Sequence, residues 1–253
     1  MKQYNSVLIT GGAKRIGASI AKYFAKEGIN VAIQYNKSIN EVEKLENQLK
    51  KYTIKFSAFK FNFEKEKKFD DFFKKIHRNF GVVDLLINNA SAFDFDTIDD
   101  SSYEIFDRHI NVNLKAPFFL SKNFVKHLEQ KKGMIINILD QRVKNITPYF
   151  TSYTISKSAL YTLTKSLALF LAPKIRVNGI SPGPTLKSKN QTIAQFKRQI
   201  SLTPMKKQIN LDEINKAIDY FISNQSVTGE ILTIDSGQSL GWAHSKSKNF
   251  SKD

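Results

Sequence analysis

The sequence predicts an α/β fold: a doubly wound, seven-stranded parallel sheet with helices on both faces. Short apolar runs of strand length alternate with longer segments whose apolar residues recur at helical spacing, and no internal repeat or linker interrupts them. At 253 residues, one α/β domain is able to bury a large core. We therefore expect a single domain over residues 1–244, followed by a polar, disordered tail at 245–253.

The first half of the chain is predicted to supply four strands and three helices. Val7-Leu8-Ile9 is a continuous apolar run, as expected of a strand buried on both faces, and residues 16–25 after it have helical spacing. Further strands are expected at 30–35, 55–61 and 84–87, and further helices at 41–51 and 69–77. The many phenylalanines between positions 56 and 73 lie on one such strand and helix, which favours core packing over a stacking platform.

The second half is predicted to add three strands. A helical stretch over residues 103–130 precedes a strand at 134–139, and Pro173 ends a helix at 151–171. A strand at 175–180 is broken by Pro182-Gly183-Pro184; helices at 193–200 and 211–223 and a strand at 229–234 follow. The polar, Lys-rich excursion at 184–208 is the predicted substrate lid, because long loops of this kind often cover active sites.

Charge and residue usage limit the classes of function. Lys and Arg number 39 against 23 Asp and Glu, a net charge of +16, but the lysines are scattered as on solvated helix faces, so we expect no nucleic-acid partner. No apolar run has the length of a membrane span, and the N-terminus has no signal-peptide core. With no cysteine either, the sequence indicates a cytoplasmic protein without a membrane partner. The four histidines lack ligand spacing, so no metal is expected.

A glycine-rich turn lies between the first strand and the first helix. Gly11, Gly12 and Gly17 leave room for backbone N–H groups to approach a pyrophosphate at the helix N-terminus, which predicts a Rossmann-like dinucleotide site. The turn resembles that of short-chain dehydrogenases, except that Arg15 stands where the middle glycine of that turn usually falls. Its planar guanidinium is able to hold a phosphate oxygen or a polar substrate edge through two hydrogen bonds.

The end of the second strand predicts which dinucleotide binds. NAD-preferring enzymes carry an acidic residue there, which bonds the adenosine ribose and would repel a 2′-phosphate. The strand instead ends in Tyr35-Asn36-Lys37-Ser38, which contains no acid. Lys37 and Ser38, together with Lys14, offer charge and donors to the additional phosphate, so NADP(H) is the expected cofactor. The alternative is that Lys37 is only a surface lysine at a helix start.

Tyr153 and Lys157 are the predicted catalytic pair. They stand four residues apart on the helix at 151–171, so their side chains share one face. The spacing alone does not locate a site, because Tyr161 and Lys165 repeat it. At about 1.5 Å per residue the second pair lies roughly 12 Å further along the helix, away from the strand ends where open α/β sheets bind ligands. Tyr161 is therefore interpreted as a packing or interface residue.

Further motifs extend the resemblance to the short-chain dehydrogenase/reductase family over residues 5–241. They follow the family's order: Asn88-Asn89-Ala90-Ser91 after the fourth strand, Asn113 in the next helix, Pro182-Gly183 after the sixth strand and Asp235-Ser236-Gly237 after the seventh. The resemblance implies a homotetramer or homodimer, with the helix at 151–171 and the long helix before it at one interface. It also implies that Leu240-Gly241-Trp242 reaches a neighbouring subunit.

The same resemblance implies the roles of individual residues. Tyr153 would donate a proton to the substrate, Asn113 would complete a proton relay through water, and Lys157 would also bond the nicotinamide ribose. The implied cofactor contacts are Gly11, Lys14, Arg15, Ile16, Gly17, Tyr35, Asn36, Lys37, Ser38, Asn62, Asn89, Ala90, Ser91, Lys157, Pro182 and Gly183.

One departure from the family indicates a narrower group. Thirteen residues before Tyr153, where the family carries serine, this chain has Asp140. Together with Ala13-Lys14-Arg15, Ser91-Ala92-Phe93 and Ala116-Pro117, it resembles pteridine reductases and related dihydropteridine (dihydromonapterin) or dihydrofolate reductases. This implies that Phe93 stacks on a pterin opposite the nicotinamide, that Ser91 and Arg15 bond its polar edges, and that Asp140 takes part in protonating a ring nitrogen.

The acid–base chemistry leaves alternatives open. Reduction of a C=N bond needs a proton at nitrogen, which a protonated Asp140 is able to supply. An ionised Asp140 would instead raise the pKa of Tyr153, whereas Lys157 and the nicotinamide charge should lower that pKa. Asp140 would otherwise serve only as a hydrogen-bond partner of Tyr153. The other candidates are a short-chain carbonyl or 3-oxoacyl-thioester reductase that uses the same pair, and a non-catalytic NADP-binding protein.

Overall fold

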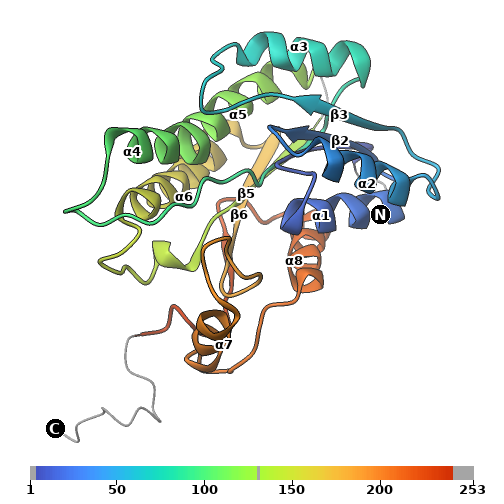
Figure 1. Cartoon of the computed structure of the whole chain (residues 1–253). Helices are drawn as coiled ribbons and strands as arrows, with labels where there is room; N and C mark the ends of the chain where they lie inside the picture. Colours follow the sequence, from blue (N-terminus) through green and yellow to red (C-terminus); the bar gives the residue numbers. More distant parts are fainter. Residues whose placement is uncertain (1–3, 130–131, 242–253) are drawn as a thin grey trace, which may run out of the picture.

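The computed structural model describes residues 4–129 and 132–241, and its strands form one parallel sheet in the order β3-β2-β1-β4-β5-β6-β7 (Figure 1). The strands are β1 Ser6–Thr10, β2 Asn30–Tyr35, β3 Phe56–Lys60, β4 Leu85–Asn88, β5 Gly133–Ile138, β6 Ile175–Pro182 and β7 Ile231–Ile234. The predicted seven-stranded parallel α/β fold is confirmed. Trp242, residues 1–3 and 243–244 of the expected domain, and the expected tail at 245–253 lie outside the described residues.

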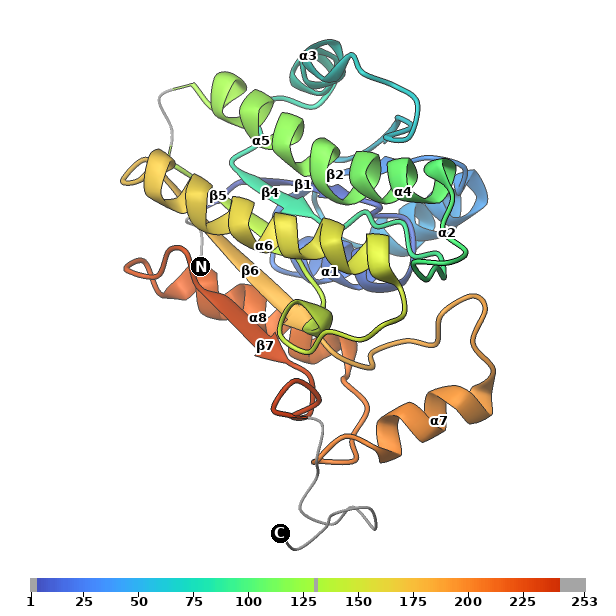
Figure 2. The same ribbon diagram turned by 90° about the vertical axis from the view of Figure 1, so that its left-hand side faces the viewer.

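Helices form a layer on each face of the sheet (Figures 1 and 2). One layer contains α1 Arg15–Lys26, α2 Ile39–Leu49 and α8 Leu211–Ser223. The other contains α3 Phe69–Asn79, α4 Tyr103–Ile110, α5 Ala116–His127 and α6 Thr151–Leu171. Among the described residues, no helix is both long and apolar enough to cross a membrane.

Strand periodicity assigns each side chain of the sheet to one layer. Val7 and Ile9 of β1 pack into the core that holds Phe24 of α1, whereas Leu8 between them packs into the core that holds Phe124 of α5. Strands buried on both faces therefore need continuous apolar runs, as the sequence has. Phe56 of β3 packs, partly buried, against the first core. The other phenylalanines between positions 56 and 73 belong to the second core, with the ring centroids of Phe61 and Phe72 4.5 Å apart, so their interpretation as core residues is confirmed: Phe59, Phe61, Phe63, Phe69, Phe72 and Phe73.

The helix expected over 103–130 is divided into two helices by a π-helical turn, η1 Asn111–Lys115. The Ala116 N–H bonds the carbonyl of Asn111, five residues back. Pro117 supplies the physical reason, because it has no N–H for the carbonyl of Asn113, which an α-helix would require. Such turns recur at functional sites, and this one carries Asn113 in a fully buried position.

Strands β1 and β4 lie side by side, and the chain leaves them toward opposite faces, which opens a crevice beyond their carboxyl ends. Thr10 holds the two ends together, because its buried Oγ1 accepts hydrogen bonds from the N–H groups of Asn89 and Ala90, both at 2.9 Å. The Asn89 amide donates in return to the Thr10 carbonyl at 2.8 Å. These hydrogen bonds therefore fix the backbone at the base of a ligand site between β1 and β4.

The excursion at 184–208 contains α7 Ile193–Ser201, which buries none of its residues and stands apart from both helix layers (Figure 2). Its base is closed by the Ile209 N–H on the Pro184 carbonyl at 3.0 Å. Arg15 donates to the carbonyls of Leu186 and Lys187, at 3.1 and 2.8 Å, and so joins the excursion to the glycine-rich turn. Its function as a lid stays a prediction.

The surface formed by α4, α5 and α6, where the subunit contact is expected, exposes several apolar side chains. The side chains of Tyr103 and Phe106 on α4, Phe118 on α5 and Ile155 on α6 are exposed. Apolar exposure of this kind is compatible with an interface. The assembly into a tetramer or dimer stays a prediction.

The hydrogen bonds that Thr10 accepts lead to a first testable prediction. Thr10→Val keeps the shape of the side chain but leaves two N–H groups at the carboxyl end of β4 without an acceptor, so the free energy of unfolding should fall by about 1–3 kcal/mol. Thr10→Ser keeps the hydroxyl and loses one methyl group, at a cost of about 1 kcal/mol. Urea unfolding of the three proteins measures both changes, and a smaller loss for the valine variant would contradict the assigned role.

Candidate active site

Most of the predicted catalytic and substrate residues meet in the crevice. Ser91 and Phe93 follow β4, Asp140 follows β5, and Tyr153 and Lys157 lie in the first two turns of α6. Asn113 enters from η1, between α4 and α5. The remaining predicted cofactor residues lie along the same edge of the sheet, at the carboxyl ends of β1, β2, β3, β4 and β6, because all strands are parallel.

The predicted catalytic pair is buried at the base of the crevice. Tyr153 is 4% exposed and Lys157 is 2% exposed. The Tyr153 hydroxyl donates a hydrogen bond to Oδ2 of Asp140 at 3.0 Å. Lys157 Nζ donates to the carbonyl of Ile138 at 2.8 Å and lies 5.8 Å from the centroid of the Tyr153 ring. The phenol, the ammonium and the carboxylate therefore belong to one cluster.

Burial is the largest cause of the pKa shifts of Tyr153 and Lys157. It raises the pKa of Tyr153 well above its usual value, and the Asp140 carboxylate raises that pKa further, while Arg142 lowers it. Burial also lowers the pKa of Lys157 to about 8, against an opposing effect of Asp140. The rise expected from an ionised Asp140 is confirmed, and the net direction is upward because the loss of solvent and the neighbouring carboxylate outweigh the opposing effect of Arg142. Tyr153 therefore keeps its proton at neutral pH.

Asp140 is held in place by Arg142, a residue that sequence reasoning missed. Asp140 Oδ1 accepts hydrogen bonds from the Arg142 backbone N–H at 2.9 Å and from its guanidinium at 3.3 Å. The carboxylate thereby caps the short helix η2 Gln141–Val143. With the Tyr153 hydroxyl, three donors point to this carboxyl group, an arrangement that suits a carboxylate. The sequence signal was an aspartate after a strand with arginine two residues later, a local capping pattern.

Aromatic rings form one wall of the site. The Phe93 ring stacks on Phe150 at a centroid distance of 4.6 Å and an angle of 6°, and meets the Tyr153 ring edge-on at 4.7 Å. The Arg142 guanidinium lies 5.5 Å from the Phe93 centroid and 4.9 Å from that of Phe150. Phe150 covers one face of Phe93, so a planar ligand that stacks on Phe93 must use the other face or displace Phe150. Sequence reasoning missed Phe150, whose φ of +58° precedes α6.

Asn113 and Ser91 hold the loop after β4. Asn113 Oδ1 accepts from the N–H of Ala92 at 2.8 Å, and its Nδ2 donates to the Ala92 carbonyl and to Ser156 Oγ, both at 3.0 Å. Both amide hydrogens are thus taken, so a proton relay through water cannot use the Asn113 amide as a donor. The exposed Ser91 hydroxyl bonds the Ala92 carbonyl at 3.2 Å.

The glycine-rich turn forms a cradle that a side chain would fill. A methyl group at Gly17 would collide with the carbonyl oxygen of Gly11, and one at Gly11, whose φ is +60°, would lie 3.1 Å from Ala90 Cα. Arg15 has a φ of +56°, a left-handed conformation that favours glycine. This agrees with the glycine expected there by resemblance. Ile16 is half-buried behind the turn and Lys14 is exposed in front of it. The backbone is thus open to a pyrophosphate.

The carboxyl ends of β2 and β3 fit the adenosine end of such a ligand. Tyr35, Asn36 and Ser38 are half-buried, and Lys37 is exposed. The side chain of Ser38, at the N-terminus of α2, forms no capping hydrogen bond with that helix. Asn62 Oδ1 instead accepts from the Glu64 N–H at 3.0 Å and closes a local turn. Residues 34–38 offer hydrogen-bond donors and the charge of Lys37, and they contain no carboxylate. This combination suits a ribose that carries a phosphate.

At the far side of the crevice, Pro182 ends β6 and Gly183 follows it. A methyl group at Gly183 would lie 2.7 Å from Asp235 Cα, so only glycine allows the chain to pass the end of β7. Among the residues that the structure describes, no group of three or more His, Cys, Asp or Glu side chains could hold a metal ion.

A dinucleotide cradle beside a buried Tyr–Lys pair defines an oxidoreductase. The family model described as short chain dehydrogenase matches residues 5–198. The chain therefore belongs to the short-chain dehydrogenase family.

Several known proteins are similar to this chain over almost its whole length. The crystal structure of FolM alternative dihydrofolate reductase 1 from Brucella suis in complex with NADP has 39% identity and a TM-score of 0.91, covering 97% of this chain and 99% of that one. An uncharacterized oxidoreductase of Thermotoga maritima is 35% identical over 91% of this chain and 96% of its own length. The 3-oxoacyl-[acyl-carrier-protein] reductase FabG of Staphylococcus epidermidis is 28% identical over 92% and 98% of the two chains.

The titration of Lys157 leads to a pH prediction. The value of kcat/KM reports groups of the free enzyme, so it should fall as the pH rises through about 8, where Lys157 loses its charge. Asp140→Asn removes a carboxylate that raises the pKa of Lys157, so the alkaline limb of the pH profile should move to lower pH.

Measuring the free energy of unfolding against pH separates this fall in kcat/KM from unfolding at alkaline pH. The folded protein releases the Lys157 proton near pH 8, whereas the unfolded chain keeps it up to the ordinary value of 10.5. The unfolded state therefore binds more protons between these values, and this group makes the free energy of unfolding rise there. An alkaline limb that stays in place in Asp140→Asn would show that Lys157 does not control it.

Proposed function

We propose that the protein is an NADPH-dependent reductase that transfers hydride to a pteridine-type C=N bond and converts a dihydropterin or dihydrofolate to its tetrahydro form. The observation that carries the proposal is the 3.0 Å hydrogen bond from the buried Tyr153 hydroxyl to Asp140. A carboxylate there, beside an aromatic wall, suits a nitrogen heterocycle better than a simple ketone, which needs only one hydroxyl donor. The likeness to FolM alternative dihydrofolate reductase 1 supports the same substrate class.

The cofactor proposal rests on the cradle and on the charge around it. The turn with Gly11 and Gly17 would hold the pyrophosphate, and Lys14, Lys37 and Ser38 would face the 2′-phosphate. When bound, NADPH supplies the hydride. The run from Gln34 to Ser38 contains no carboxylate, so it offers neither the acceptor that favours NAD nor a charge that repels a phosphate. Related structures that contain NADP include that of a Burkholderia cenocepacia short chain dehydrogenase.

In the proposed reaction, Tyr153, Asp140 and Arg142 hold and orient the proton that the substrate receives. Tyr153 stays protonated at neutral pH because burial and Asp140 raise its pKa. Asp140 orients the hydroxyl hydrogen, and Arg142 keeps the carboxylate of Asp140 in place. The phenol O–H bond breaks as the ring nitrogen gains a proton, either directly from Tyr153 or from Asp140 as Asp140 takes the proton of Tyr153, and Tyr153 is left as a phenolate that solvent protonates again. Lys157 Nζ, on the Ile138 carbonyl, would hold the nicotinamide ribose.

A carbonyl or 3-oxoacyl-thioester reductase is the second candidate. The 3-oxoacyl-[acyl-carrier-protein] reductases of staphylococci are similar over nearly the full chain. Tyr153 and Lys157 are the residues that such a reaction would also use. In this case Asp140 would act only as a hydrogen-bond partner that takes the place of serine.

A substrate panel tests the proposal. Purified protein with NADPH is expected to oxidise it on addition of dihydrobiopterin, dihydromonapterin or dihydrofolate, and to act more slowly with NADH. The measurement is the loss of NADPH absorbance, with a ketone and an acetoacetyl thioester as competing substrates. Turnover of these carbonyl compounds together with no reaction of the three pterins would reject the pteridine assignment in favour of the second candidate.

The two Tyr-x-x-x-Lys pairs offer a matched test of catalysis. Tyr153→Phe removes the proton donor and should lower kcat/KM by roughly 10²–10⁴-fold, the usual contribution of a positioned acid. Tyr161→Phe makes the same chemical change two turns along α6 and should leave kcat/KM unchanged. Steady-state kinetics of both variants decide, and full activity in Tyr153→Phe would mean that the protein is not an enzyme of this mechanism.

A further inference from the structure

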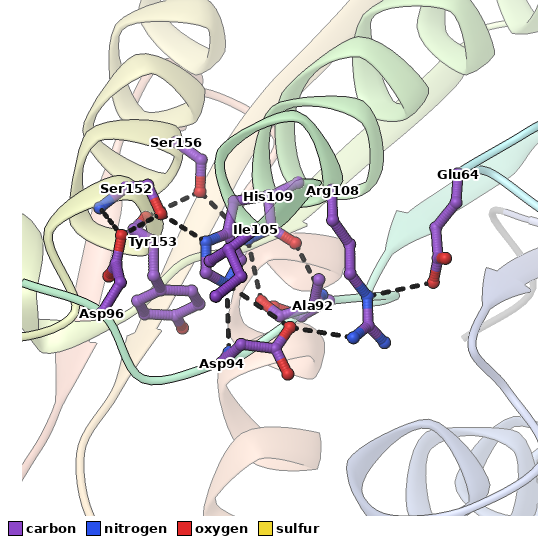
Figure 3. A network of polar contacts seen from close by, with 12 residues as sticks. Glu64, Ala92, Asp94, Asp96, Ile105, Arg108, His109, Ser152, Tyr153 and Ser156 are labelled. Carbon is purple, nitrogen blue, oxygen red and sulfur yellow. Dashed lines mark hydrogen bonds and ion pairs between the residues drawn. The ribbon is translucent and has the colours of Figure 1, made fainter. Parts of the chain in front are cut away.

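A chain of buried polar groups lies directly behind Tyr153 and takes no part in the mechanism above (Figure 3). It consists of Asp96 from the loop after β4, His109 from α4 and Ser152 from α6. The first two are fully buried, and Ser152 is 2% exposed. Because buried polar side chains cost free energy unless they are satisfied, their convergence beside the predicted catalytic tyrosine calls for a specific role.

The hydrogen bonds fix the protonation of His109. Its Nε2 lies 3.0 Å from the backbone nitrogen of Asp94, which is only able to donate, so Nε2 is the acceptor. The neutral ring therefore carries its hydrogen on Nδ1, which donates to Ser152 Oγ at 2.7 Å. Ser152 passes its own hydrogen to Oδ2 of Asp96. The chain thus has one direction, from the Asp94 N–H through the imidazole to a carboxylate.

Burial favours this neutral state. It is the main cause that lowers the pKa of His109, assisted by Arg108 and Lys157 and opposed by Asp94 and Asp96. A protonated ring would also turn an N–H toward the Asp94 N–H and lose that bond. The imidazole therefore works as one donor and one acceptor.

Asp96 serves as the cap of α6 from outside the helix. Phe150, at the N-cap position, has no side-chain acceptor for the first N–H groups. Asp96 Oδ2 accepts the Ser152 N–H at 3.1 Å, and the Asp96 carbonyl accepts the Phe150 N–H at 2.8 Å. A carboxylate at this end also interacts favourably with the helix dipole. The turn that carries Tyr153 is therefore anchored to the loop that carries Phe93.

The outer end of the chain is fixed as well. Arg108, next to His109 on α4, lies 3.0 Å from the Asp94 carboxylate and donates to Glu64 at 3.1 Å (Figure 3). The His109 ring lies with its centroid 5.8 Å from that of Tyr153, in an edge-on arrangement. One side chain therefore contacts the tyrosine ring and bonds both segments that form the site.

We propose that His109 is a positioning residue that sets the Phe93 loop and the Tyr153 turn against each other. It is fully buried, and it acts through two bonds to protein groups that serve different halves of the site. The Nε2 bond holds Asp94, next to the stacking residue Phe93. The Nδ1 bond holds Ser152, next to the proton donor Tyr153. The inference rests on the proposed reductase function for its kinetic consequences only.

Three substitutions separate the two bonds. His109→Asn keeps a donor at the place of Nδ1 and loses the acceptor for Asp94, so the KM of the substrate should rise about tenfold with kcat nearly unchanged. His109→Gln keeps an acceptor at the place of Nε2 and loses the bond to Ser152, so kcat should fall about tenfold with KM nearly unchanged. Tenfold corresponds to one lost hydrogen bond. His109→Phe should show both effects, and His77→Phe on the surface of α3 is the control for loss of a histidine.

Hydrogen exchange supplies a readout that a failed pteridine assignment would not affect. We expect faster amide exchange over residues 92–97 in His109→Asn, over 150–154 in His109→Gln, and over both segments in His109→Phe, with NADPH affinity retained. If His109→Phe does not fold, the two single-bond variants still decide. Unchanged exchange at both segments, or equal changes of KM and kcat in His109→Asn and His109→Gln, would overturn the proposal. No turnover of pterins by the wild-type protein would instead reject only the pteridine function.

Discussion

The hydrogen bond between the buried phenol of Tyr153 and the partly buried carboxylate of Asp140 is the constraint on which the site depends. The Asp140 side chain keeps 18% of its surface exposed, and removing the rest from water costs free energy unless charges and donors compensate for it. Arg142 and its backbone N–H supply two donors on one oxygen, which leaves the other oxygen for Tyr153. Burial keeps the phenol protonated, and the same carboxylate adds to this effect, because an ionised Tyr153 would face a like charge.

Polar contacts, rather than the apolar cores, align the segments of the site. At and beyond the strand ends, Thr10, Asn89 and Asn113 bond the backbone of neighbouring segments. Such bonds specify distance and direction, whereas apolar packing tolerates small shifts. A reaction that requires hydride and proton to arrive at adjacent atoms needs alignment of this kind. The π-helical turn around Asn113 fits this interpretation, since it re-aims one amide into the crevice at the expense of regular helix geometry.

The sequence predicted the elements well because their signals are local. The helix at 151–171 and the strand at 30–35 begin and end where the apolar spacing and Pro173 indicated. The rise that Asp140 causes in the pKa of Tyr153 was foreseen, but the larger effect of burial was not, because residue spacing shows which groups are near but not how much water remains around them. Phe150 and His109 were missed for a related reason: their roles depend on contacts between segments 40 or more residues apart, or on a left-handed backbone without glycine. Arg142 did carry a local signal in its spacing from Asp140, and only its contact with the Phe93 ring is long-range. Pro117 was the one local sign of the divided helix.

The second Tyr-x-x-x-Lys pair shows what the motif contributes and what the fold adds. Lys165 Nζ lies 4.8 Å from the centroid of the Tyr161 ring, so the helix brings that pair together as it does the first. Lys165 remains exposed, however, and its bond with Tyr161 raises its pKa, whereas burial lowers the pKa of Lys157. Identical spacing on one helix thus gives opposite electrostatics. Helix geometry makes the contact in both pairs, but only the first pair is buried beyond the strand ends with Asp140 in hydrogen-bond reach, and this burial sets its electrostatics.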